Sequence, residues 1–274
     1  MQNVEQLIAR DPGGRGVAAL LVPGDLGRAA GAVAAAERVL IITGFGVGPH
    51  GVAETDGPPG ALFLGRALTR LGKQVTFATH RLCEPVMVAG IATLGLPAPL
   101  EVLDRTQSPA PMLDRHNVDL VISIELPGRA ADGQYYNMRG IPITERTAPL
   151  DELLLVARER AIPTIGVGDG GNEAGMGKVV EQVRQAVRGG ERIASVVSAD
   201  YLISAGTSNW GAYGLVATLD PKLLPDPEEE VALLTALVVA GALDGVRLEA
   251  AATVDGLEQE EYLQILRDLK GSGR

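Results

Sequence analysis

Short runs of β-branched and aliphatic residues alternate along the chain with longer stretches rich in Ala and Leu. This alternation is typical of βαβ units, and it predicts an α/β fold with a largely parallel sheet flanked by helices in a Rossmann-like layering. The predicted strands are Arg38–Thr43, Gln74–Thr79, Leu100–Leu103, Asp119–Ile124, Pro163–Val167 and Tyr201–Ser204. The predicted helices are Asp25–Ala36, Pro59–Leu71, Pro85–Leu94, Pro109–His116, Leu150–Arg160, Gly175–Val187, Asn209–Leu219, Glu228–Ala242 and Leu257–Leu269.

No internal repeat and no low-complexity linker divides the 274 residues. The segment Pro221–Glu230 is the best candidate for a break, yet its pattern is that of a connection between two helices. We therefore expect residues 1–274 to form a single α/β domain with a helical C-terminal extension over residues 228–270.

The net charge, the length of the apolar runs and the single cysteine exclude several classes of binding partner and of covalent cross-link. The formal net charge of −10 argues against nucleic acid, because phosphate binding needs concentrated Lys and Arg. The apolar runs are too short or too interrupted to span a bilayer, so no membrane partner is expected. Cys83 is the single cysteine, which excludes an intramolecular disulfide and fits a cytoplasmic location. The sequence leaves the oligomeric state open, a homo-oligomer included.

Three loops are longer than the packing of helices on a sheet requires, namely Gly44–Pro58, Leu126–Ala148 and Gly168–Ala174. Each follows a predicted strand and so begins at the carboxyl end of the sheet. Ligands of open α/β sheets bind at that edge. These loops are therefore the predicted functional segments.

The third loop carries the most chemistry. Asp169, Asn172 and Glu173 place three oxygen-bearing side chains within five residues, which suits a hard cation such as Mg²⁺ or Mn²⁺, or a substrate ammonium. Gly170 and Gly171 permit positive φ angles and close approach of the backbone to a ligand. The competing interpretation is a purely structural glycine turn.

The first two loops add further charged groups. Glu54 and Asp56 alternate, so one of them can face a ligand while the alternative is that Asp56 only caps the following helix. Glu125 directly follows a strand, from where its carboxylate can project into a cleft. Arg129 and Arg139 suit a substrate carboxylate, although an internal ion pair between Glu125 and one arginine explains the pattern equally well.

The segment after the last predicted strand reads Thr207-Ser208-Asn209-Trp210. Ser208 or Asn209 can cap the next helix and present its N–H groups at the same edge, and Trp210 can form a wall of a pocket. A nicotinamide cofactor is disfavoured: Gly46–Gly51 matches G-x-G-x-x-G, but Pro49 delays the helix and the next strand ends without a carboxylate.

Together these motifs resemble the D-glutamate cyclase family, in its C-terminal-type domain. The residues that carry the resemblance lie in family order between positions 38 and 219. They are Glu54–Ala61, Pro127–Arg129, Tyr135–Gly140, Gly168–Gly177 and Ser208–Tyr213. The resemblance implies a hydro-lyase that reversibly dehydrates D-glutamate to 5-oxo-D-proline, with a small amino-dicarboxylate as substrate.

Under this interpretation four carboxylates are candidates for acid–base catalysis, and a divalent cation remains an open question with Asp169, Asn172 and Glu173 as its candidate ligands. The candidate catalytic residues are Asp169, Glu173, Glu125 and Asp56. The candidate substrate-binding residues are Arg129, Arg139, Asn137, Tyr136, Gly170, Gly171, Asn172, Ser208, Asn209 and Trp210. The alternatives are a non-catalytic protein that binds a small metabolite and, less favoured, a nicotinamide-dependent enzyme.

Overall fold

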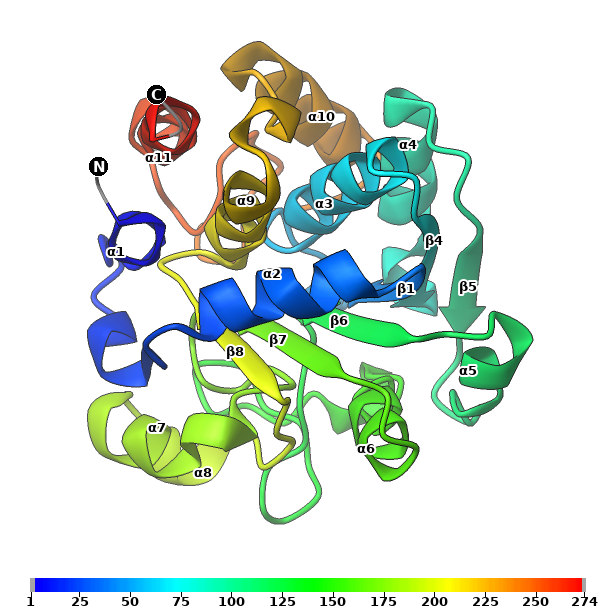
Figure 1. The fold of residues 1–274 in the computed structure, drawn as a ribbon. Coiled ribbons are helices and arrows are strands. Elements are labelled where there is room, and N and C mark those ends of the chain that lie inside the picture. Colours follow the sequence, from blue (N-terminus) through cyan, green and yellow to red (C-terminus); the bar gives the residue numbers. More distant parts are fainter. Residues whose placement is uncertain (1–2, 273–274) are drawn as a thin grey trace.

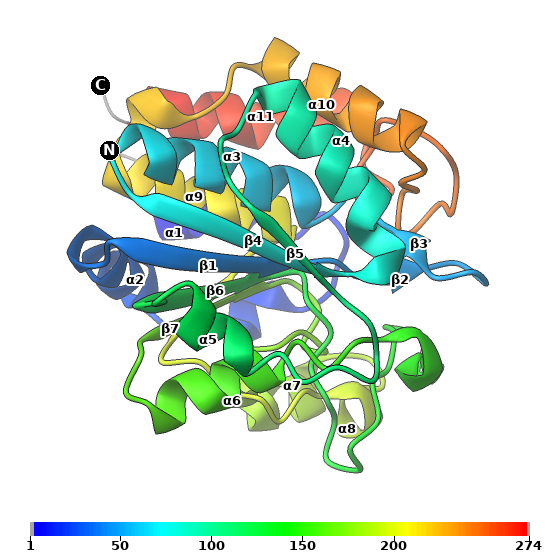
Figure 2. The same cartoon turned by 90° about the vertical axis from the view of Figure 1, so that its right-hand side faces the viewer.

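The computed structural model describes residues 3–272 and contains one six-stranded parallel sheet between two layers of helices (Figures 1 and 2). The strands are β1 (Arg38–Thr43), β4 (Gln74–His80), β5 (Leu100–Leu103), β6 (Leu120–Ile124), β7 (Thr164–Gly168) and β8 (Tyr201–Ser204). A separate two-stranded hairpin is formed by β2 (Gly46–Val47) and β3 (Val52–Ala53). The predicted α/β class with a parallel sheet is confirmed.

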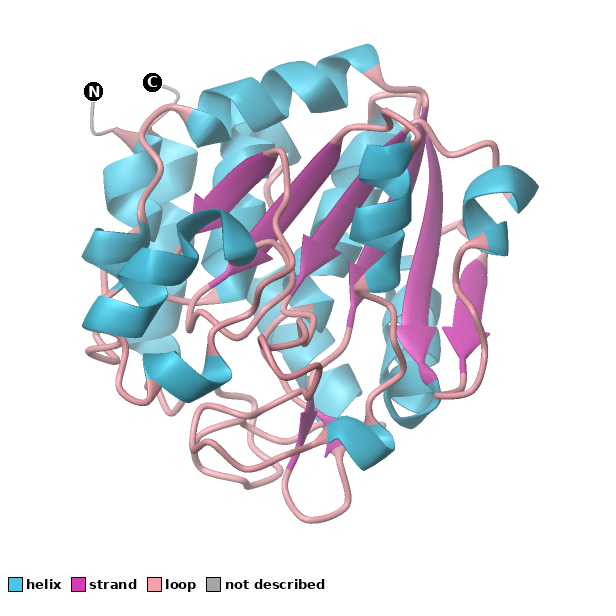
Figure 3. Cartoon of the chain, turned by 90° about the horizontal axis from the view of Figure 1, so that it is seen from below, coloured by secondary structure: helices cyan, strands magenta, loops and turns pink. Residues whose placement is uncertain are grey.

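The strand order is β5-β4-β1-β6-β7-β8. The chain builds one half of the sheet outward from β1 and then returns to build the other half from β6, so the direction of winding reverses between these two neighbours. Such a switch point opens a crevice beyond the carboxyl ends of the strands, where ligands bind. Figure 3 shows the strands pointing toward one cluster of loops at that edge.

The helices follow the predicted pattern closely, with a few additions. They are α1 (Val4–Ile8), α2 (Asp25–Ala35), α3 (Pro58–Arg70), α4 (Glu84–Leu94), α5 (Pro111–Arg115), α6 (Glu152–Glu159), α7 (Val180–Ala186), α8 (Gly190–Ile193), α9 (Ser208–Leu219), α10 (Pro227–Val239) and α11 (Gln259–Gly271). The short helices α1 and α8 and the β2–β3 hairpin were not expected from the pattern.

The start of α7 differs from the prediction. The helix expected from Gly175 begins only at Val180, after a 3₁₀ turn over Gly177–Val179. Gly175 has a φ of +110°, and a Cβ there would lie 2.7 Å from the Cα of Gly166 in β7. The chain therefore crosses over the strand as a loop, in a conformation that an α-helix cannot adopt.

Alternate residues of β1 pack into the hydrophobic cores on the two faces of the sheet. Val39 and Ile41 pack into a core with α3, α9, α10 and α11, whereas Leu40 and Ile42 pack with α5 and α6 on the other face. This two-sided burial explains the continuous apolar runs of the parallel strands. The C-terminal helices α10 and α11 lie in the same layer as α3 and α9 (Figure 2).

The expectation of a single domain stays a prediction. No helix within residues 3–272 is long and apolar enough to cross a membrane.

A buried acid, Glu230 on α10, links this layer to the C-terminal helix. Its two carboxylate oxygens accept hydrogen bonds of 2.7 Å from the hydroxyls of Tyr213 on α9 and Tyr262 on α11. Burial raises the pKa of Glu230 to about 7, although the two tyrosine hydroxyls and the charge of Arg66 oppose the rise.

This raised pKa predicts a pH dependence of stability. Between pH 4.5 and about 7 the folded state holds a proton on Glu230 that the unfolded chain has released. The free energy of unfolding should therefore fall by roughly 3 kcal/mol as the pH rises through this window. In Glu230→Gln that part of the loss should disappear, as measured by urea denaturation at pH 4.5 and pH 7.5. An equal loss in both proteins would show that Glu230 does not titrate in this range.

Candidate active site

The N-termini of α3 and α9 cap each other at the carboxyl edge of the sheet. Asp56, which precedes α3, accepts hydrogen bonds of 2.8 Å from the backbone N–H groups of Ser208 and Asn209 at the start of α9. In return, Oδ1 of Asn209 accepts from the N–H groups of Gly57 and Gly60 at the start of α3. The cap that the sequence suggested for Asp56 exists, but on a different helix. These N–H groups at the starts of α3 and α9 are thus already hydrogen-bonded within the protein and are not available to a ligand anion.

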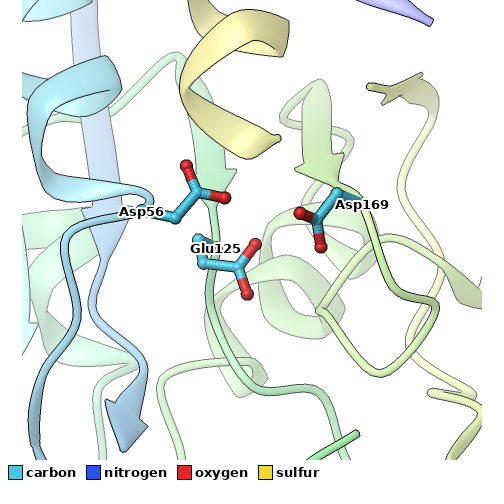
Figure 4. A group of neighbouring side chains, drawn as sticks. All are labelled: Asp56, Glu125 and Asp169. Atoms are coloured by element: carbon cyan, nitrogen blue, oxygen red, sulfur yellow. The ribbon is translucent and has the colours of Figure 1, made fainter. Parts of the chain in front are cut away.

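Glu125 occupies the first position after β6, directly at the switch point. Its φ of +44° is unusual for a residue with a side chain, so the chain holds Glu125 in a strained turn. The Oε2 atom accepts a hydrogen bond of 2.5 Å from the hydroxyl of Ser208. Figure 4 shows the carboxylate between those of Asp56 and Asp169, and one oxygen of each lies within 4.8 Å of the others.

Two residues from opposite ends of the chain complete this group of acids. Arg15 precedes the first long helix, and its guanidinium contacts the carboxylate of Asp169. The same guanidinium binds Asp255, from the loop before α11, at 3.0 and 3.1 Å. The functional edge therefore includes segments outside residues 38–219, where the sequence motifs lie.

Glu54 directly follows β3 and is buried, with 6% of its surface exposed. No described residue donates a hydrogen bond to the carboxylate of Glu54. By contrast, both carboxylate oxygens of Asp56, two residues later, accept backbone hydrogen bonds. Gly245 makes room for it, because a Cβ at that position would lie 2.1 Å from Oε2 of Glu54. Of the two alternating acids, Glu54 is the one that lines the cavity.

The electrostatics of the group favour a cation. Burial, together with the charge of Asp255, raises the pKa of Asp56 to about 8. Burial and neighbouring carboxylates also raise the pKa values of Glu54, Glu125 and Asp169 well above their ordinary range. Burial disfavours the charge on Arg15, but Asp169 and Asp255 outweigh it and raise the pKa of the guanidinium. A positively charged ligand group would offset the repulsion among these acids.

A cavity of about 1040 Å³ opens above these residues. Glu54, Glu125 and Asp169 line it as buried groups, whereas Arg139 and Arg188 line it as exposed ones. Arg146, half-buried, lies on the same wall and donates to the carbonyl of Pro49. The cavity therefore has buried carboxylates at its base and arginine side chains at its opening.

Residues 4–270 match a family model described as D-glutamate cyclase-like, C-terminal. The chain belongs to this family. The mitochondrial D-glutamate cyclase of Homo sapiens is 37% identical over 236 residues, which are 80% of this chain and 38% of the human protein. The resemblance seen in the sequence is thus confirmed, and the chain spans well under half the length of this relative.

Solved structures resemble the chain more loosely. An exopolyphosphatase-related protein from Bacteroides fragilis has a TM-score of 0.43 and 11% identity, over 92% of this chain and 58% of the other. The sugar isomerase domain of an RpiR transcription factor from Sphaerobacter thermophilus has a TM-score of 0.32 and 18% identity, over 80% and 87%. Neither likeness carries a functional argument.

In this D-glutamate cyclase-like chain the glycine loop is held by its own side chains. The carboxylate of Glu173 accepts from the N–H groups of Gly170 at 2.8 Å and Gly171 at 2.7 Å. The amide nitrogen of Asn172 donates to the carbonyl of Tyr136, while its Oδ1 is buried and has no partner among residues 3–272. Glu173, Gly170 and Gly171 thus shape the loop, and Asn172 lines the cavity beside Asp169.

Three predicted substrate contacts lie outside the cavity. Both oxygens of Asp151 accept from the guanidinium of Arg129, at 2.8 and 2.9 Å. Arg129 is therefore in an internal ion pair, but with Asp151 and not with Glu125 as the sequence suggested. Trp210 is buried in the core, where it stacks on Tyr262. Tyr136 is also buried, with its hydroxyl bonded to Asp132. None of these three side chains lines the cavity.

Of the remaining candidates, Asn137 and Arg139 line the cavity. Oδ1 of Asn137 accepts from the N–H groups of Arg139 and Ile141, so Asn137 holds the turn that presents Arg139. Arg15 and Asp255 were missed in the sequence because nothing near them forms a motif. For Glu54 a signal existed, since Glu54 and Asp56 were recognised as alternatives, but the prediction named Asp56 as the catalytic candidate, whereas Glu54 lines the cavity.

Proposed function

We propose that this chain catalyses the reversible cyclisation of D-glutamate to 5-oxo-D-proline and water. The observation that carries the proposal is the cavity at the switch point, with buried carboxylates below and arginines at its rim, in a chain of the D-glutamate cyclase-like family. In the reaction the amine nitrogen bonds to the γ-carboxyl carbon and one C–O bond breaks. Two protons leave the nitrogen, and both end on the departing oxygen as water.

The charges of the cavity match this substrate. Glu54, whose carboxylate accepts no hydrogen bond from the described residues, attracts the ammonium group of the amino acid. Arg139 and Arg188 are exposed, and neither forms an ion pair with any residue that the structure describes. Their guanidinium groups are therefore free to bind the two carboxylates of glutamate, which they match in geometry.

Proton transfer is assigned to Glu54. Cyclisation needs a group that takes a proton from the amine and returns it to the departing oxygen. The oxygens of Asp56 and Glu173 already accept backbone hydrogen bonds, Asp169 is paired with Arg15, and Glu125 accepts from the hydroxyl of Ser208. Glu54 lines the cavity with no donor from the described residues, so its carboxylate is free to exchange a proton with the substrate.

The test is to incubate the full chain with D- or L-glutamate, and in the reverse direction with each enantiomer of 5-oxoproline. Products are separated by chiral chromatography, with incubations without protein as the blank. Formation of 5-oxo-D-proline above the blank supports the proposal. No product in either direction would overturn it, and saturable binding of glutamate in calorimetry without turnover would identify a binding protein instead.

Arg139→Met should raise the KM for D-glutamate roughly 10- to 100-fold, because a charge-assisted hydrogen bond contributes about 1.5–3 kcal/mol. The kcat should change much less, since the guanidinium binds substrate and transition state alike. Arg70→Met, at the far end of α3, is the matched control and should leave KM unchanged. An unchanged KM in Arg139→Met would remove this arginine from the substrate site.

The cytoplasmic location inferred from the sequence stays a proposal, since the human relative is named as mitochondrial. The exclusion of nucleic acid as a partner and the open oligomeric state also stay as predictions.

A further inference from the structure

Asp56, Glu125 and Asp169 each direct one oxygen toward a common point at the switch of the sheet (Figure 4). They come from three different loops, and all three are buried. Arg15 supplies one positive charge against these three carboxylates. Glu54 acts electrostatically on Glu125, and Asp255 acts on Asp56 and Asp169, so the protein's own side chains leave the group short of positive charge.

A second observation points to a ligand at this place. Asn172 is 1% exposed and lines the same cavity as Glu125 and Asp169. Its Nδ2 is satisfied by the carbonyl of Tyr136, but Oδ1 has no hydrogen-bond donor in the described part of the chain. A buried amide oxygen without a partner costs about 1–3 kcal/mol, and a bound cation would remove that cost.

We propose that Asp56, Glu125 and Asp169, together with Oδ1 of Asn172, hold one divalent cation, Mg²⁺ or Mn²⁺. Oxygens on opposite sides of such an ion lie about 4.2 Å apart, because each metal–oxygen bond is about 2.1 Å. Neighbouring oxygens around such an ion are about 3.0 Å apart. The carboxylate oxygens lie within 4.8 Å of one another, so shifts on the order of one ångström bring them around one ion. Coordination sites remain: Oε1 of Glu125 and Oδ1 of Asp169 accept no hydrogen bond from residues 3–272.

The ligand set decides the kind of ion. Carboxylate and amide oxygens are hard ligands, which suit Mg²⁺ and Mn²⁺, whereas zinc sites use His and Cys ligands far more often. The sequence suggested Asp169, Asn172 and Glu173 as ligands. The oxygens of Glu173 accept from backbone N–H groups of its own loop, and Glu173 is not among the carboxylates whose oxygens lie within 4.8 Å of one another. Asp56 also accepts two backbone N–H groups, but one of its oxygens does lie within that group. The structure replaces Glu173 with Glu125 and Asp56.

This site deepens the proposed function, on which its chemical use depends. A divalent cation held by these residues would supply Lewis-acid polarisation of the substrate's γ-carboxyl group. Binding of the cation itself does not depend on the activity. The two proposals can therefore fail separately.

The experiment is a titration of the chelator-treated full chain with Mn²⁺, without substrate, followed by electron paramagnetic resonance and calorimetry. One saturable site per chain is expected, with competition by Mg²⁺ and an increase in Tm. Glu125→Gln and Asn172→Ala should each weaken binding roughly tenfold or more, and Asn172→Asp should preserve it. Glu230→Gln, which removes a buried acid that does not line the cavity, is the control and should bind as the unaltered chain does.

Absence of saturable Mn²⁺ binding by the unaltered chain would overturn the site, whatever the variants do. Unchanged affinity in both Glu125→Gln and Asn172→Ala would do so as well, because binding would then lie elsewhere. Mn²⁺ binding without turnover of D-glutamate would leave the cation site standing and remove the proposed activity. Turnover of D-glutamate that is unaffected by chelation, with no Mn²⁺ bound, would support the proposed activity and remove the cation site.

Discussion

Glu54→Gln is expected to lower the kcat of cyclisation roughly 10²- to 10⁴-fold, the range typical of a lost acid–base group. Gln has the shape of Glu but cannot exchange a proton with the substrate. No described residue hydrogen-bonds to the Glu54 carboxylate, so the substitution breaks no contact that holds the site together. The fold should therefore be retained while turnover is lost, as measured by initial rates over a range of D-glutamate concentrations.

Glu249→Gln provides the matched control, because Glu249 is exposed and lies outside the cavity, in the same C-terminal loop region as Gly245. It should leave both kcat and KM unchanged. If Glu54→Gln raised only KM, Glu54 would be a group that binds the ammonium. A variant with full kcat would place the proton transfer on another carboxylate.

Asn209→Ala is expected to lower the free energy of unfolding by roughly 3–5 kcal/mol, because it leaves several buried polar groups unpaired at about 1–3 kcal/mol each. Oδ1 of Asn209 accepts from Gly57 and Gly60, and Nδ2 donates to the carbonyl of Thr55. All of these groups are buried, so water does not replace the lost bonds. Urea denaturation followed by circular dichroism measures the change.

Asn137→Ala is the comparison that isolates the effect of burial. Oδ1 of Asn137 also accepts from two backbone N–H groups, but these bonds are exposed. Water can take the place of the side chain there, so the loss should stay near or below about 1 kcal/mol. Similar losses in the two variants would show that the crossed caps of α3 and α9 contribute no more than a surface turn.

The sequence predicted the strands well, because parallel strands covered on both faces appear as continuous apolar runs whose ends are marked by charged residues and glycines. Strands β1, β5 and β8 begin and end at the predicted residues. Helix α7 was placed too early because Gly175 and Gly177 precede an amphipathic stretch. Only the close packing of Gly175 on Gly166 explains why that segment is a loop.

The site was predicted in part. That the three long loops share one edge followed from their position after strands, and Glu125, Asp169, Asn172 and Arg139 do line one cavity. Other polar residues of the same motifs hold the framework instead. The partners that decide this are remote in sequence: Asp56 caps a helix 152 residues later.

The sequence by itself determined the fold class, the elements and the edge at which function resides, since these depend on local periodicity and on the rule that successive parallel strands point the same way. The tertiary structure alone decided the strand order, which carboxylates are free, and the contribution of Arg15 and Asp255 from opposite ends of the chain. Whether an acid holds a helix or faces a ligand depends on which hydrogen-bond donors reach it, and those donors come from distant segments that only folding brings together.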